Sequence, residues 1–330
     1  MKTPLYRDAL RSSSKLAWQH KGLWAFGLFA MLLGQLGVVE LLAKVALASS
    51  SVRAGGLWSY IVFFLSPDAW SQFFNSSHWG ADGWLWFVWM LLIVFGLAFA
   101  LLFAAVVSQG AIVYSAAQYA KRQSSFPDDA EAWHKGVSHF WRLLSLNLAR
   151  KFVFILMALA VLWSTVNALV EPSGFDIVLF FMIFILSSLV GLVVSFLLVY
   201  AASYVVVEEY PFWRALSSAW KLFISHWVVS FEVGFLLLAA NVAMLVLAMG
   251  ALVYLFLLPV LLGTFFAQAF ASLAVFKIGV FVGYGLFLFS VILLWSIFTV
   301  FVINVWTFLF VKMHKNGIKS RVLHWMRLSA

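Results

Sequence analysis

Six long runs of apolar residues restrict the fold of this chain more than any other feature. They lie near 23–47, 84–112, 152–170, 177–206, 227–250 and 279–311. A helix that crosses the hydrocarbon core of a bilayer, about 30 Å thick, needs about 20 such residues. Only 10% of the residues are charged, whereas soluble domains carry about 25%. The sequence therefore predicts an all-α polytopic membrane bundle with six transmembrane helices.

The basic residues indicate how these helices are oriented. All Lys and Arg residues except Lys44, Arg53 and Lys277 fall in the segments 1–22, 121–151, 208–226 and 312–330. If all six runs span, these segments share one side, and Lys and Arg are enriched in cytoplasmic loops. The net charge of +9 thus reflects topology, and no nucleic-acid partner is expected. Both termini are predicted to face the cytoplasm.

Two connections on the opposite side are long and apolar. They comprise residues 49–82 and 251–278, and both are compatible with interfacial or re-entrant segments on the outer face. Residues 252–276 are alternatively long enough for a seventh span. A seventh span would place the basic C-terminal tail outside, against the charge rule. Six spans are therefore favoured.

No catalytic or metal-binding pattern occurs in the sequence. There are no cysteines, so a disulfide framework and a thiolate metal site are both excluded. The motifs of zinc peptidases, serine hydrolases and P-loop enzymes are absent. The histidines are scattered, with no two at a spacing of four. We expect neither an enzyme activity nor a cofactor.

Three amphipathic segments precede the first, third and fifth apolar runs. They are residues 5–21, 133–150 and 212–226, and we call them elbow helices. A basic face opposite an apolar face is typical of a helix that lies in the membrane plane. The alternative is a soluble-type helix packed on its neighbour. The candidate contacts to lipid headgroups are Arg7, Arg11, Lys15, Arg142, Arg214 and Lys221.

The middle elbow helix is predicted from its own pattern. Its apolar side chains would share one face, and Asp128 and Glu131 are spaced to cap its first turn as a capping box. The apolar residues of this face are Trp133, Val137, Phe140, Trp141, Leu144 and Leu148.

The elbow segments also resemble one another. A shift of 206 residues matches Lys15-Leu16 and His20 to Lys221-Leu222 and His226, and a shift of 72 matches Phe140-Trp141-Arg142 to Phe212-Trp213-Arg214. Self-similarity in a fixed order suggests duplication of one supersecondary unit. Each unit would be an elbow followed by a transmembrane hairpin, which makes the repeats parallel. The predicted units are 5–120, 133–208 and 211–313.

Polar residues inside the apolar runs are candidate intramembrane sites because they are expensive in lipid. Glu40 and Lys44 are four residues apart and able to pair, while Glu232 is shallow enough to reach the inner headgroups. Amides in such runs are usually interhelical hydrogen bonds. We interpret Gln109, Asn241 and Asn304 in that way.

One stretch resembles a known family. Residues 208–222, Glu-Glu-Tyr-Pro-Phe-Trp-Arg-Ala-Leu-Ser-Ser-Ala-Trp-Lys-Leu, follow an apolar run and are similar to the motif of the glycerophosphoryl diester phosphodiesterase membrane-domain superfamily. The opening from Asp8 to Trp24 resembles the N-terminus of stand-alone relatives. The resemblance implies a bacterial multi-pass protein of the cytoplasmic membrane. It implies no activity, because the phosphodiesterase barrel is absent from the sequence.

These observations favour a non-enzymatic membrane protein that organises lipids or partner proteins at the inner leaflet. Anionic headgroups are the expected partners, since each basic side chain near the surface is worth about 1 kcal/mol. A membrane-protein partner or a second copy is compatible with the small-residue faces but is not required. The alternative is a transporter or permease for a small or amphiphilic solute. It rests on the repeat and on Glu40 and Glu232.

Overall fold

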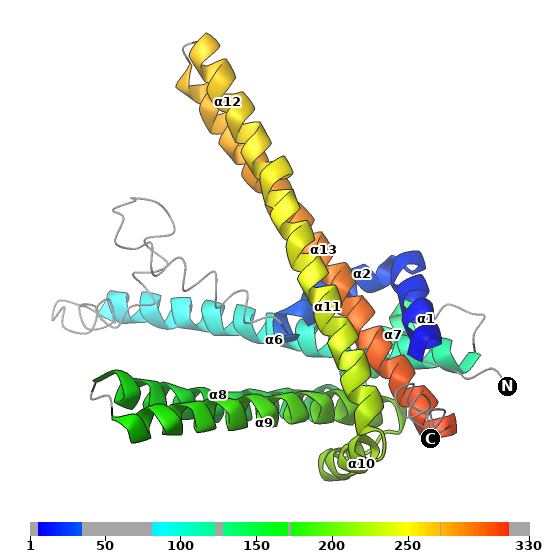
Figure 1. The fold of residues 1–330 in the computed structure, drawn as a ribbon. Coiled ribbons are helices and arrows are strands. Elements are labelled where there is room, and N and C mark those ends of the chain that lie inside the picture. Colours follow the sequence, from blue (N-terminus) through cyan, green and yellow to red (C-terminus); the bar gives the residue numbers. More distant parts are fainter. Residues whose placement is uncertain (1–5, 35–80, 123–127, 171–172, 271, 317–330) are drawn as a thin grey trace, which may run out of the picture. The chain divides into compact units, whose positions relative to one another are not determined.

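The computed structural model describes residues 6–34, 81–122, 128–170, 173–270 and 272–316, and all regular elements in these ranges are helices (Figure 1). Five helical segments there are long and apolar enough to cross a membrane: Trp84–Lys121, Phe140–Leu169, Gly174–Val207, Trp227–Ala269 and Leu273–His314. The predicted all-α membrane fold is confirmed. The first predicted run begins with the shorter apolar helix α2 (Gly22–Gly34), and its remainder lies outside the described residues.

The chain divides into two compact units. The smaller comprises Leu32–Ala105, and the larger comprises the rest. Helix α6 (Ala81–Arg122) supplies the main described part of the smaller unit, where apolar side chains such as Trp86 and Phe95 are exposed. Residues 35–80, which hold Glu40, Lys44 and most of the connection predicted at 49–82, lie outside the described residues.

The described part of the larger unit contains three short helices that each lead into an apolar helix. These elbows are α1 (Tyr6–Gln19), α7 (Asp129–Ser138) and α10 (Phe212–Ser225). They are followed by α2, α8 (Phe140–Val170) and α11 (Trp227–Ala251). The C-terminal ends of α1 and α10, at Gln19 and Ser225, are 206 residues apart. The shift of 206 therefore matches equivalent elements.

Each junction between an elbow and its long helix holds a histidine. These are His20, His139 and His226. In the second and third junctions a serine precedes the histidine, and its hydroxyl lies 2.9 and 2.8 Å from the ring Nδ1. The same hydroxyls donate to carbonyls three residues earlier, at 2.8 and 2.9 Å. Both elbows thus end with the same local hydrogen bonds.

The middle elbow differs from the prediction. Helix α7 ends at Ser138, and residues 140–150 are the first turns of α8. The apolar spacing misled because it continues across the break at His139. As a result, Trp141 and Leu148 are 70% and 56% exposed, while α7 buries Ala132 and Gly136 instead. The match at a shift of 72 is wrong, because it pairs the start of α8 with the start of α10.

Two hairpins extend from the larger unit. In the first, α8 packs against α9 (Gly174–Val207). In the second, α11 continues through the π-helical turn η2 (Leu252–Leu257) into α12 (Leu258–Ala269), and this segment packs against α13 (Leu273–Asn316). Residues 251–278 are therefore neither a re-entrant segment nor a seventh span; they lengthen the hairpin.

The π-helical turn has a physical cause. Pro259 lacks a backbone donor, and its ring clashes with the carbonyl four residues earlier in a regular α-helix. A wider turn just before it relieves that conflict without ending the helix. The continuous segment Trp227–Ala269 has 43 residues, which corresponds to about 65 Å at 1.5 Å per residue. That length is roughly twice the hydrocarbon thickness of a bilayer.

The far half of this hairpin is joined by direct backbone contact. A Cβ atom added at Gly279 would lie 2.8 Å from the Cα of Gly263 and 2.9 Å from the carbonyl oxygen of Pro259. Helices in lipid associate through such close approach, since no hydrophobic effect drives them together. Gly279 is therefore required for the contact between α12 and α13.

We predict that Gly279→Ala destabilises the protein by about 1–3 kcal/mol, because the added methyl overlaps backbone atoms. Gly285→Ala is the matched control on the same helix, since nothing lies within 4 Å of its added Cβ. The control should be neutral or stabilising by up to about 1 kcal/mol. Thermal unfolding in detergent measures both, and equal melting temperatures would contradict the contact.

Candidate functional site

The packed core of the larger unit lies where the elbows meet the ends of the long helices. We call this region the elbow end: α1, α7 and α10, the C-terminal parts of α6, α9 and α13, and the first turns of α8 and α11. By contrast, in the most apolar 18-residue stretch of α9 only 6% of the residues are buried. In the corresponding stretch of Trp227–Ala269 none is buried. Buried side chains at the elbow end include Val106, Ile112, Tyr200, Val205, Leu309 and Phe310.

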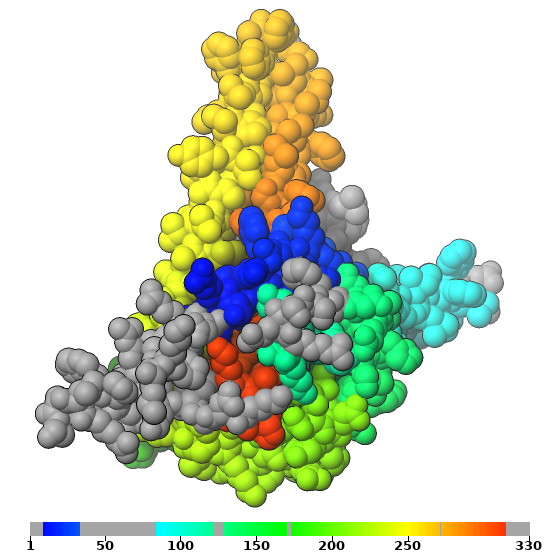
Figure 2. Space-filling view, turned by 90° about the vertical axis from the view of Figure 1, so that its right-hand side faces the viewer, coloured from blue at the N-terminus to red at the C-terminus, as the bar shows by residue number. Residues whose placement is uncertain are grey.

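Each elbow packs on the C-terminal part of a long helix. For α7 and α10 this is the long helix just before the elbow in the sequence, and for α1 it is the last helix of the described chain. Helix α1 packs on α13, and α10 packs on α9. Helix α7 lies against α6, where a Cβ atom on Gly136 would be 2.3 Å from the carbonyl oxygen of Val107. Figure 2 shows α1 and α2 in blue beside the red C-terminal part of α13. The three elbows thus occupy equivalent places.

Hydrogen bonds fix the helices to one another at this end. The hydroxyl of Ser296 on α13 donates to the carbonyl of Trp24 on α2 at 2.5 Å, and the Trp24 indole donates to the carbonyl of Ala17 at 2.7 Å. The hydroxyls of Tyr200 and Ser230 join α9 to α11 at 2.8 Å. These bonds connect different helices and hold the elbow end in one arrangement.

A basic pocket lies between α1, α6 and α13. Its volume is about 460 Å³, within the range of roughly 300–1,000 Å³ found for small-molecule sites. Three cationic side chains line it, and none of its described lining residues is acidic. The lining residues are Arg11, Ser12, Lys15, Tyr119, Ala120, Phe308 and Lys312.

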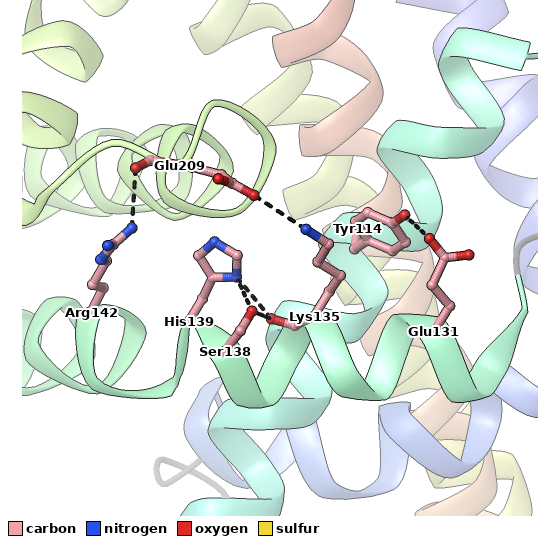
Figure 3. Close-up of polar contacts among 7 residues, drawn as sticks. All are labelled: Tyr114, Glu131, Lys135, Ser138, His139, Arg142 and Glu209. Carbon is pink, nitrogen blue, oxygen red and sulfur yellow. Dashed lines mark hydrogen bonds and ion pairs between the residues drawn. The ribbon is translucent and has the colours of Figure 1, made fainter.

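A second, smaller pocket lies between α7, α6 and α9. Its volume is about 210 Å³, and it holds Lys121, Lys135 and Glu209 among its lining residues. Figure 3 shows the polar contacts beside it: Lys135 Nζ donates to Glu209 Oε1 at 3.2 Å, and Arg142 Nη1 donates to the Glu209 carbonyl at 3.1 Å. In this pocket, the chain itself provides the anion that faces the lysine.

Glu209 is held in an unusual backbone conformation. Its φ is +57°, the left-handed region that costs a non-glycine residue roughly 1–2 kcal/mol. It follows the end of α9, where the amides of Glu208 and Tyr210 both donate to the Tyr204 carbonyl, at 3.2 and 3.3 Å. The hydrogen bond and charge of Lys135 hold the pKa of the Glu209 carboxyl below its usual 4.5. Charge pairing thus accompanies a strained turn.

The third equivalent place, between α10, α9 and α13, contains aromatic rings. Tyr204 stacks on Tyr210 with centroids 5.6 Å apart and meets Phe310 edge-on at 4.7 Å. The guanidinium of Arg214 lies 4.2 Å from the centre of the Tyr210 ring. His314 Nε2 is 3.9 Å from a Glu208 carboxylate oxygen. Here too the cationic groups have partners from the chain.

The structure places the predicted headgroup contacts in different settings. Arg11 and Lys15 line the basic pocket, Arg142 binds the Glu209 carbonyl, and Arg214 lies over Tyr210. Lys221 is exposed on α10. Arg7 belongs to α1, but its side chain is outside the described part.

The predicted intramembrane polar sites do not converge in the described chain. Gln109 accepts a hydrogen bond from Asn147 on α8 at 2.8 Å, which confirms its interpretation as an interhelical contact. Asn304 is fully buried, and its amide has no hydrogen-bond partner among the described residues, so the same interpretation was wrong there. Glu232 and Asn241 are both half-buried on α11.

Two residues of the elbow end escaped the sequence reasoning. Lys312 was counted only as a topological charge, because nothing local relates it to Arg11 and Lys15. Glu209 was noted only within the family motif. The sequence does contain a signal for Glu209. Two adjacent acids, Glu208 and Glu209, directly follow an apolar run, a pattern that indicates a helix end where carboxylates meet basic side chains.

No protein-family model, curated protein or solved structure matches this chain. The resemblance of residues 208–222 to the glycerophosphoryl diester phosphodiesterase membrane-domain superfamily therefore stays a prediction. Function has to be argued from the geometry of the elbow end.

We predict that two substitutions of Glu209 differ in their melting temperatures. Glu209→Gln keeps the strained turn and loses the charge, so it should lower the melting temperature. Glu209→Gly also loses the charge but relieves roughly 1 kcal/mol of strain, so it should melt above Glu209→Gln. Thermal unfolding between pH 3 and pH 8 measures both effects.

The pH dependence has a defined sign. Because the folded-state pKa of Glu209 is lowered, the pair stabilises the protein above pH 4.5 and is lost as the pH falls through the folded value. The difference between wild type and Glu209→Gln should therefore vanish at low pH. A difference that stays constant as the pH falls through the whole titration of the carboxyl groups would show that the charge is irrelevant.

Proposed function

We propose that this is a non-enzymatic multi-pass protein of the bacterial cytoplasmic membrane that organises anionic lipid headgroups at the inner leaflet. The main support for this proposal is that basic and apolar side chains are exposed on different parts of the larger unit. Basic side chains gather around the packed elbow end, whereas the hairpins expose apolar side chains along most of their length. Apolar hairpins need hydrocarbon around them, and the elbow end then meets the headgroups.

The distribution of charge supports a cytoplasmic elbow end. Lys121, Lys135, Arg142, Arg214 and Lys221 all lie there, and the first turn of α9, at the other end of the first hairpin, carries Asp176. Basic residues near membrane-spanning helices favour the cytoplasmic side. In this orientation both chain termini face the cytoplasm.

The transporter alternative needs a polar cavity at the bilayer midplane. Neither of the two pockets described above is lined by Gln109, Glu232 or Asn241. Lipid organisation explains the exposed basic residues without a pathway, and it is the function that we favour.

We predict that a cysteine at position 174 reacts with an impermeant reagent added outside cells. A cysteine at position 217, exposed on α10, should react only after the cells are permeabilised. The chain contains no native cysteine, so the labelling has no background. Labelling of position 217 from outside in intact cells would invert the proposed orientation.

Lipid selectivity tests the function itself. In proteoliposomes, spin-labelled phosphatidylglycerol should associate with the protein more strongly than spin-labelled phosphatidylcholine, and the difference should shrink with added salt. Replacing Arg7, Arg11 and Lys15 by Gln should reduce the preference without unfolding the bundle. Equal association of the two lipids with wild-type protein would refute the proposal.

A further inference from the structure

In the basic pocket between α1, α6 and α13, the described lining residues bring three cations together and include no acidic partner. Arg11 and Lys15 are one helical turn apart on α1, and Lys312 approaches from α13. None of the three forms an ion pair with an acid in the described part of the chain. Cations brought together in this way repel one another, so their arrangement favours a bound anion.

At the other two elbows, groups of the chain itself compensate the positive charge. Beside α7, the Glu209 carboxylate contacts Lys135 at 3.2 Å. Beside α10, Arg214 stacks on Tyr210, and Glu208 approaches His314. Only beside α1, among these three places, do the described residues leave the cations without such a group. A bound anion would compensate the charge of the cations beside α1.

We propose that this pocket binds one phosphate group, carried either by a lipid headgroup or by free phosphate. This inference rests on the proposed lipid-organising function and gives it a defined site. Three cations suit a phosphate because an arginine fork pairs with two oxygens while the lysines supply point charges. Ser12 adds a hydroxyl to the lining. Basic pockets between transmembrane helices bind phospholipid headgroups in this way.

The apolar part of the lining fits the rest of an esterified phosphate. Phe308 and Ala120 form walls beside the cations, and Phe308 packs edge-on against Tyr119 with centroids 6.0 Å apart. Glycerol and the first acyl carbons of a phospholipid would contact these walls. Inorganic phosphate would use the cations alone, so the two sources differ in affinity.

Native mass spectrometry of the full chain in uncharged detergent tests the site. Phosphatidic acid is titrated with and without inorganic phosphate as competitor. Wild type should bind one equivalent saturably, and replacing Arg11, Lys15 and Lys312 by Gln should weaken binding on the order of 100-fold. Displacement by millimolar phosphate identifies a free-phosphate site, whereas retention identifies a lipid site.

Two further variants separate the pocket from general surface charge. Replacing Lys21, Lys151 and Lys277 by Gln removes the same charge outside the pocket and should leave the saturable site within about two-fold. Ala120→Phe keeps every charge but fills the pocket, and it should weaken binding at least 10-fold. Ala120→Phe therefore tests the pocket even if the triple variant unfolds. Circular dichroism monitors the folding of all variants.

Two outcomes would overturn the inference. If both triple variants lose binding equally and Ala120→Phe binds like wild type, the lipid follows surface charge alone, and only the general function survives. If neither triple variant changes lipid association in this titration or in the spin-label measurement, the proposed function fails as well. The two failures are therefore distinguishable.

Discussion

The close packing of the elbows across the ends of the long helices is the contact on which the larger unit depends. Apolar helices in lipid gain nothing from the hydrophobic effect when they meet, so direct packing and hydrogen bonds must hold them. Here those contacts concentrate at the elbow end, through Gly136 against Val107, Ser296 to Trp24 and Tyr200 to Ser230. By contrast, the most apolar stretches of the hairpin helices bury few of their side chains.

This arrangement also explains where the polar chemistry lies. Three similar junctions bring basic side chains beside the ends of α6, α9 and α13, and each set of cations needs a compensating group. Glu209 provides it beside α7 even though its turn is strained. Aromatic rings and Glu208 provide it beside α10. The pocket beside α1 differs, because its described lining residues include no such group.

The sequence predicted what local patterns encode. Apolar length predicted the long helices, amphipathic spacing predicted α1 and α10, and Asp128 was recognised as a cap, where it accepts from the Ala130 amide at 3.2 Å. The capping box was only half right, because Glu131 accepts from Tyr114 instead. Spacing could not locate the break at His139, since the pattern is helical on both sides. Nor could it bring Lys312 to Lys15, which depends on packing between distant segments.

We propose that all three elbows lie together in the headgroup layer of one leaflet. Spin labels on single cysteines at Ser14, His134 and Ser217, each exposed on its own elbow, report depth through their accessibility to oxygen and to a polar nickel complex. We expect the three depths to agree within about 5 Å and to lie outside the hydrocarbon core of about 30 Å. A label on any one elbow found within that core, or on the opposite surface, would contradict it.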